Sequence, residues 1–161
     1  MSQLNTNKIF PRDGKQSGAY GGIVQVKYAS TDTVMSLTST TYTDVPGVSI
    51  SITPQSASNA ILLMLTFSGN QGTGNSGEGR LRYKIIRTVS GTDTTVATVE
   101  EALVDYGTSN IHVQGLGQNL VDTPATTSSV TYKMQVSSHN AGQIQINNNG
   151  RTDLVAMEIS G

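Results

Sequence analysis

Val48-Ser-Ile-Ser-Ile-Thr53 alternates apolar and polar residues with a period of two, which is the pattern of a half-buried β-strand. Pro54-Gln-Ser-Ala-Ser-Asn59 follows, and this composition is typical of a turn. The next run, Ala60-Ile-Leu-Leu-Met-Leu-Thr-Phe67, is apolar on both faces and short for a helix. These residues predict a half-buried strand, a turn and then a central strand that is buried on both sides.

The same β pattern continues on either side of this stretch. Ser90-Gly-Thr-Asp93 predicts the turn of a hairpin, and Asn149-Gly150 predicts a type I′ hairpin between the last two strands. Glu100 to Asp105 has a weak helical pattern of less than two turns, for which we expect a loop or a single helical turn. The other expected strands are residues 22–28, 80–87, 94–99, 129–136, 143–147 and 154–159.

About eight or nine short strands separated by turn residues predict an all-β protein, an antiparallel β-sandwich or jelly roll. Residues 1–21 are polar and rich in glycine, and they predict an extended N-terminal arm with a Gly-rich joint. Residues 22–161 are then expected to form the β-sandwich domain. The chain of 161 residues has the length of one domain.

Composition narrows the classes of function. Only 13% of the residues are charged and the net charge is −1, so we expect no electrostatic attraction to nucleic acid or to an anionic membrane. There is no cysteine, which excludes disulfides and thiolate metal sites. The sequence has neither the pattern of a signal peptide nor an apolar run of membrane-spanning length. We expect no membrane insertion and synthesis without a signal peptide.

Motifs for catalysis are weak. Residues 72–77 match G-x-G-x-x-G, but a strand follows them where a dinucleotide site needs a helix N-terminus. His112 and His139 have no second ligand at metal-binding spacing, and Asp105, Asp122 and Asp153 stand apart along the chain. We therefore predict a protein that is not an enzyme and that binds no cofactor and no metal.

Two long segments, residues 69–79 and 105–119, are rich in Gly, Asn, Ser and Gln and are expected to be loops. Loops on a rigid β scaffold are where recognition usually occurs, although both segments fit simple connections as well. The candidate receptor-facing residues are Asn70, Gln71, Asn75, Tyr106, Asn110 and His112.

A resemblance to a known family extends over most of the chain. Gly21-Gly-Ile-Val-Gln-Val26, Thr40-Thr-Tyr-Thr-Asp-Val-Pro-Gly-Val48 and Leu120-Val-Asp-Thr-Pro-Ala-Thr-Thr127 are similar to virion structural proteins of tailed bacteriophages, especially those of marine and cyanobacterial hosts. The resemblance implies a compact β domain, trimeric and displayed on the particle, as in a short tail fibre or fibre tip involved in host adsorption. It places the protein in the virion after synthesis in the host cytoplasm.

Self-association is also expected from the residues, because apolar side chains on both faces of residues 60–67 need a subunit contact to cover them. In the arm, the isolated apolar residues Leu4, Ile9, Phe10 and Pro11 predict docking onto another tail or capsid component; the alternative is a terminus that docks onto nothing. Two other functions stay open: a capsid decoration or cement protein on the head, and a carbohydrate-binding module that contacts a host surface glycan.

Overall fold

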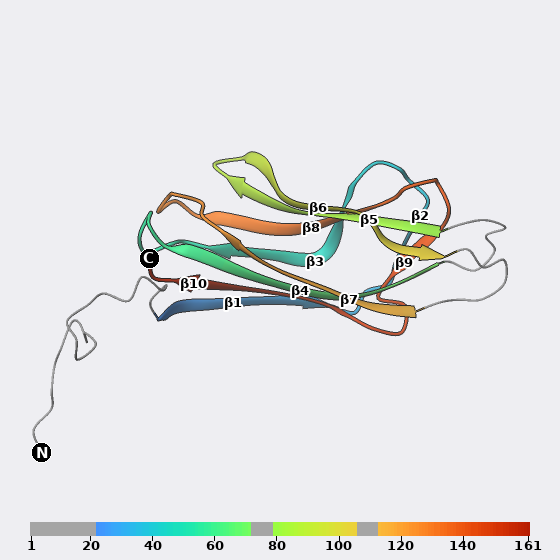
Figure 1. Cartoon of the computed structure of the whole chain (residues 1–161), viewed down its shortest axis with the longest axis horizontal. Helices are drawn as coiled ribbons and strands as arrows, with labels where there is room; N and C mark the ends of the chain where they lie inside the picture. The colour runs from blue at the N-terminus through green and yellow to red at the C-terminus, as the bar shows by residue number, and fades with distance from the viewer. Residues whose placement is uncertain (1–21, 72–78, 106–112) are drawn as a thin grey trace, which may run out of the picture.

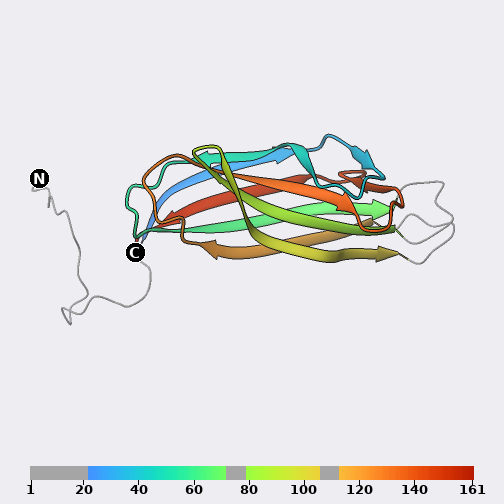
Figure 2. The same cartoon turned by 90° about the horizontal axis from the view of Figure 1, so that it is seen from above.

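The computed structural model describes residues 22–71, 79–105 and 113–161, which form two packed antiparallel sheets (Figure 1). The two layers face each other, and the strands of both run along the same long axis (Figure 2), as in aligned sandwiches. The strands are β1 Ile23–Thr31, β2 Met35–Leu37, β3 Thr43–Ile52, β4 Ala60–Gln71, β5 Gly79–Val89, β6 Thr92–Asp105, β7 Val113–Asp122, β8 Val130–Ser138, β9 Ile144–Ile146 and β10 Thr152–Ile159.

The pairing pattern is that of one long hairpin rolled into a sandwich. β5 pairs with β6, β4 with β7, β3 with β8, β2 with β9 and β1 with β10, so the pairs are nested about the β5–β6 turn. Rolling adds three further pairings: β10 with β4, β9 with β4 and β5 with β8. In sheet A, β7 pairs with one edge of β4, and β10 and β9 pair with successive parts of its other edge. β1 then pairs with β10 and β2 with β9, whereas sheet B has the order β3-β8-β5-β6.

This nested arrangement is a jelly roll, which confirms the predicted fold class. Its core lies between the sheets and is built from the inward residues of alternating strands. Leu63 and Leu65 of β4 and Met134 and Val136 of β8 are 0% exposed. Alternating burial over residues 130–136 of β8 and along the whole of β10 directs one face of each strand to this core.

The first predicted hairpin is confirmed. Ser90 and Gly91 have φ values of 49° and 80°, and their neighbours Val89 and Thr92 are paired. Two consecutive positive φ values are the geometry of a type I′ turn, whose twist matches that of the flanking strands. This turn is the tip of the rolled hairpin.

The second predicted hairpin, at Asn149-Gly150, is wrong. β9 and β10 do not pair with each other; both lie along the same edge of β4, as one strand interrupted by residues 147–151. Asn147 and Asn149 have positive φ values, which asparagine tolerates. The asparagines and Gly150 therefore form an outward excursion of a single strand, which a local turn signal does not distinguish from a hairpin.

Three further expectations are corrected. Glu100 to Asp105 belongs to β6, and residues 113–119 belong to β7 instead of a loop. The run Ala60–Phe67 is central in sheet A, but its outer face is only partly buried, and Met64 on that face is 36% exposed. Cross-strand pairing decides the first two cases, because a polar or helix-compatible segment becomes a strand when a partner satisfies its backbone.

The two ends of the sandwich differ in what they carry. At one end, Ser160 donates a backbone hydrogen bond to Gly22, so the first described residue lies beside the C-terminus. At the other end, Gly79 pairs with Asp105 and Asn70 with Val113. β4 and β6 therefore end, and β5 and β7 begin, at the end of the sandwich opposite Gly22 (Figure 1).

Candidate interaction surface

The outer face of sheet A carries apolar side chains in register across four strands. Cross-strand partners lie on the same face of a sheet, and the pairings define two adjacent rows. In the order β1, β10, β4, β7, the first row is Val26, Met157, Leu62 and Val121, and the second is Tyr28, Val155, Met64 and Asn119.

We call the seven apolar residues of these two rows the apolar face; the eighth position, Asn119, is polar. Val26 is 52%, Tyr28 56% and Val121 51% exposed. Isolated exposed apolar residues are ordinary, but a contiguous patch of several hundred Å² marks an interaction site. The apolar face is therefore the first candidate for contact with another macromolecule.

The outer face of sheet B has the opposite character. Its corresponding row is Asp44, Gln135, Lys84 and Thr98. Lys133 lies 3.2 Å from a carboxylate oxygen of Asp44, and Gln135 donates to the same carboxylate at 2.6 Å. The polar groups of this face satisfy one another and suit exposure to water, so the asymmetry between the two sheets singles out sheet A.

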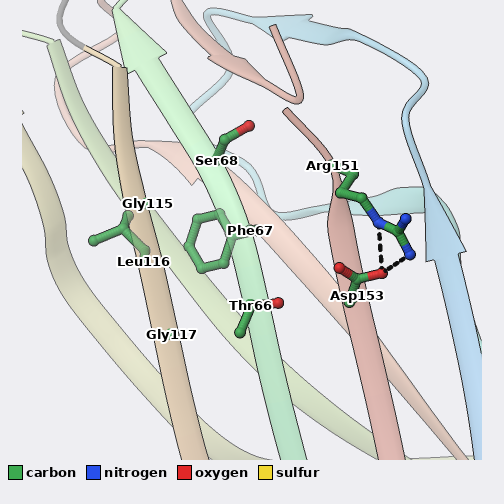
Figure 3. Close-up of a pocket in the computed structure, with 8 residues that line it drawn as sticks. All are labelled: Thr66, Phe67, Ser68, Gly115, Leu116, Gly117, Arg151 and Asp153. Atoms are coloured by element: carbon green, nitrogen blue, oxygen red, sulfur yellow. Dashed lines mark hydrogen bonds and ion pairs between the residues drawn. The ribbon is translucent and has the colours of Figure 1, made fainter. Parts of the chain in front are cut away.

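A shallow hollow of about 470 Å³ lies next to the apolar face (Figure 3). The floor of the hollow is β4 at residues 66–68, and one side is β7 at residues 115–117. The other side is formed by Asp153 of β10 and by Arg151, which immediately precedes that strand. A Cβ placed on Gly115 would meet no atom within 4 Å. The hollow exists because β7 presents glycines where its neighbours present side chains.

A polar cluster closes the hollow on the β10 side. Arg151 Nε donates to Asp153 Oδ1 at 2.8 Å, and the Tyr28 hydroxyl donates to the same oxygen at 2.6 Å. Partial burial alone would raise the pKa of Asp153, but the hydrogen bonds from Arg151 and Tyr28 outweigh it, and the pKa lies below its ordinary value. The carboxylate is therefore ionised at neutral pH and fixes Tyr28 in place at the border of the apolar face.

A second polar cluster ties the two sheets together. Arg87 of β5 forms an ion pair with Asp122 of β7 at 2.8 Å, and the Tyr132 hydroxyl of β8 donates to Asp122 at 2.6 Å. Tyr132 is 0% exposed, and burial together with the bond to the carboxylate raises the pKa of its hydroxyl. The cluster is structural, because all three groups are engaged with one another.

Glu158 is a buried carboxylate that closes the end near Gly22. Its oxygens accept hydrogen bonds of 2.6 Å from the Gln55 backbone N–H and from the side-chain amides of Asn59 and Gln25. Burial alone would raise the pKa of Glu158, but these donors outweigh it and lower the pKa. The side chain thereby links β1, β10 and the turn before β4, which is again a structural role.

The predicted site residues are only partly placed. Asn70 and Gln71 lie at the end of β4, beside the two segments that leave the sandwich there. The other four candidates, Asn75, Tyr106, Asn110 and His112, lie outside the described residues, as do Leu4, Ile9, Phe10 and Pro11 of the arm. The candidate recognition loops and the docking arm remain predictions.

Sequence reasoning missed the partners of two acidic residues. Asp122 and Asp153, which stand apart along the chain, are paired with Arg87 and Arg151. Asp153 had a local signal, since Arg151 is two residues away and side chains at i and i+2 share a face of a strand. Asp122 had none, because Arg87 is 35 residues distant and the pairing depends on how the sheets stack.

Among residues 22–71, 79–105 and 113–161, no three carboxylate or imidazole side chains gather in a way that would hold a metal ion. His139 is exposed in the turn after β8, as the interpretation of it as a surface histidine predicts. The same part of the chain contains no helix with the length and hydropathy needed to cross a bilayer.

No protein-family model and no curated protein matches the sequence. Among solved structures, the chain is similar to infectious bursal disease virus, Gx strain, with a TM-score of 0.43 and 16% identity over 97% of this chain and 43% of that one. Infectious bursal disease virus VP2 in a subviral particle gives a TM-score of 0.41 and 16% identity over 98% and 42%. T=1 particles derived from infectious bursal virus give 0.40 and 16% over 96% and 41%.

The chain thus spans less than half of the length of each of these viral proteins. A likeness at this TM-score carries no weight for function or assembly. The class of the fold, a jelly roll, rests on the nested strand pairings. Because one fold hosts many functions, the functional argument rests on the surface features described above.

Proposed function

We propose that the protein is a non-enzymatic structural protein of a virus particle, displayed on its surface as a short tail fibre or fibre tip of a tailed phage that takes part in host adsorption. The observation that carries this proposal is that the two ends of the sandwich differ in the segments that adjoin them. Gly22, which follows the expected arm, lies at one end, and the strands that flank the two candidate recognition segments meet at the other. An arm that anchors and loops that reach outward need this separation.

We also propose that identical subunits associate, and the apolar face supports this. An exposed apolar face that extends over several strands is unfavourable for a lone domain and is covered when subunits meet. The phage resemblance of the sequence implies three copies. Lateral packing through sheet A would leave the polar face of sheet B toward water and both ends of the sandwich accessible.

Immunogold labelling of intact particles of the encoding virus tests the location. We expect label at the tail. Label spread over the head would replace the adsorption role by that of a capsid decoration protein, and absence of label from purified particles would overturn the virion assignment itself.

Two variants test whether one end of the protein anchors it to the particle and the other end contacts the host. Deletion of residues 1–17 is expected to abolish incorporation into particles while the sandwich still folds, as circular dichroism would verify. Replacement of residues 72–77 by a Gly/Ser linker of equal length is expected to leave incorporation intact and to reduce adsorption to the host. Unchanged incorporation in the first variant would contradict the docking of Leu4, Ile9, Phe10 and Pro11.

A further inference from the structure

The edge strands of a sheet expose unpaired backbone N–H and C=O groups that can pair with another chain, and proteins commonly block them with charges, proline or bulges. Five strands stand at sheet edges among the described residues: β2 is only three residues long, which itself limits pairing, and β1, β3 and β6 carry blocking features. The β1 edge has Lys27 and a register shift, the β3 edge has Asp44, Pro46 and a register shift, and the β6 edge has acidic residues and two register shifts.

The β7 edge lacks these features. Its pairing with β4 runs in unbroken register from Val113 to Asp122. Val-Gln-Gly-Leu-Gly-Gln-Asn-Leu-Val-Asp contains no proline and no lysine. The single charge, Asp122, stands at the last position and is bonded to Arg87. β7 is therefore an edge of regular register whose one charge is already paired, and it lacks the features that prevent strand addition.

We propose that β7 pairs with β7 of a second copy, antiparallel, about a two-fold axis at Gln118, so that the two A sheets become one continuous sheet. An interface about a two-fold axis must be self-complementary, with residue i of one copy opposite residue j of the other and the reverse. With the axis at Gln118, each residue faces the one equally far from Gln118 in the partner copy.

The outward residues match under this register. Val121, which is 51% exposed, lies opposite Gly115 of the second copy. Gly115 borders the hollow, and no atom lies within 4 Å of the position that its Cβ would take. The exposed valine of each copy thus fills the open space of the other, and the contact occurs twice.

The inward residues match as well. Leu116 lies opposite Leu120 of the second copy, and both leucines are partly buried against the core. Gln118 faces its own copy. Two identical side-chain amides therefore meet at the axis, and each of them has both a donor and an acceptor.

Charge favours β7 over the other edges for such self-pairing. Self-pairing of β1 about Lys27, or of β3 about Asp44, would place like charges opposite each other, which destabilises a sheet. The β7 contact also leaves the apolar face uncovered and doubles its width. It is therefore compatible with the proposed contact through sheet A and does not depend on a virion location.

Crosslinking tests the register, because the chain has no cysteine of its own. Gln118→Cys in the purified full chain, treated with a short bis-maleimide, is expected to give a covalent dimer. Lys27→Cys, on the opposite edge strand of the same sheet, is the matched control and is expected to give none above the collisional background.

Two second substitutions separate the edge from the apolar face. Val121→Lys together with Gly115→Lys, added to Gln118→Cys, is expected to lower dimer yield about tenfold or more, since it brings two lysines opposite each other across the contact. Val26→Lys, in the same apolar row and equally exposed, is expected to leave the yield unchanged. A Gln118→Cys protein that does not crosslink, or one whose dimer survives the paired lysines at positions 115 and 121, would overturn the β7 contact, whereas immunogold results bear only on the virion role.

Discussion

Arg87 Nη1 lies 2.8 Å from Oδ1 and 3.0 Å from Oδ2 of Asp122, and this pair joins sheet B to sheet A at the edge formed by β7. The side chains are only 20% and 11% exposed, so neither charge is well solvated without the other. Breaking a buried pair from one side leaves the remaining charge uncompensated.

The first prediction is that Asp122→Asn lowers the free energy of unfolding by about 2 kcal/mol, less than the full cost for a completely buried pair because some solvent reaches both groups. Urea denaturation followed by circular dichroism measures it. Asp32→Asn, at an exposed position, serves as the control and should leave stability within about 0.5 kcal/mol.

Tyr132→Phe removes the second donor to the same carboxylate and leaves the ring in place. We expect a loss of about 1.5 kcal/mol, the usual value for a hydrogen bond to a charged acceptor. Combined with Asp122→Asn, the loss should be smaller than the sum of the two, because both changes act on one network. Strict additivity would show that the hydroxyl and the carboxylate contribute independently.

Glu158 predicts an acid-sensitive step in stability. Its pKa in the folded protein lies below the ordinary value of 4.5 that it regains on unfolding. The stabilisation is therefore complete above the unfolded pKa and is lost as pH falls through the folded pKa. Glu158→Gln should cost about 2 kcal/mol at pH 7, because an amide N–H then faces another donor, and should flatten the decline of melting temperature between neutral and acidic pH. An unchanged pH profile in this variant would assign the decline to other carboxylates.

Gly91 predicts a backbone effect without a steric one. A Cβ at this position meets no atom within 4 Å, yet φ is +80°. Gly91→Ala should lower the free energy of unfolding by about 1 kcal/mol, the cost of a left-handed conformation for an L-residue. Gly91→Asn should cost less than alanine does, since asparagine tolerates this region. Thermal unfolding of both variants gives the comparison.

Gly150 predicts a steric effect of substitution. A Cβ there would lie 2.3 Å from Ser68 Oγ, so Gly150→Ala must displace β4 or the excursion before β10, at about 1–3 kcal/mol. Ser68→Gly in the same chain removes the obstructing atoms and should recover most of that loss. A double mutant no more stable than Gly150→Ala alone would place the strain elsewhere in residues 147–151.

The fold class could be predicted from local pattern because each signal is a property of consecutive residues. Three signals are of this kind: the alternation at residues 48–53, the apolar run Ala60–Phe67 and the glycine at position 91. The first two reflect the pleat of a strand and the third reflects φ in a turn, and none of them requires knowledge of distant residues. These signals were enough for an all-β sandwich with a hairpin at Ser90-Gly91.

The remaining features depend on which strands meet. Residues 113–119 are polar and contain two glycines, so their strand becomes evident only from the pairing with β4. Asn149-Gly150 carries a hairpin signal, but the competition of β9 and β10 for the same edge of β4 turns it into an excursion. In both cases the backbone hydrogen-bond partner, which is distant in sequence, decides the local structure.

By itself the sequence determined that the chain forms β-strands, where the tip of its central hairpin lies, and that it has apolar residues to spare, since these follow from side-chain alternation and from the φ requirement of a two-residue turn. The tertiary structure alone decided that the spare apolar residues of β1, β4, β7 and β10 form continuous rows on one outer face, and that β7 is left as an open edge. The physical reason is that register and edge position come from cross-strand pairing between distant segments, and a one-residue shift in register would move every one of these side chains to the other face.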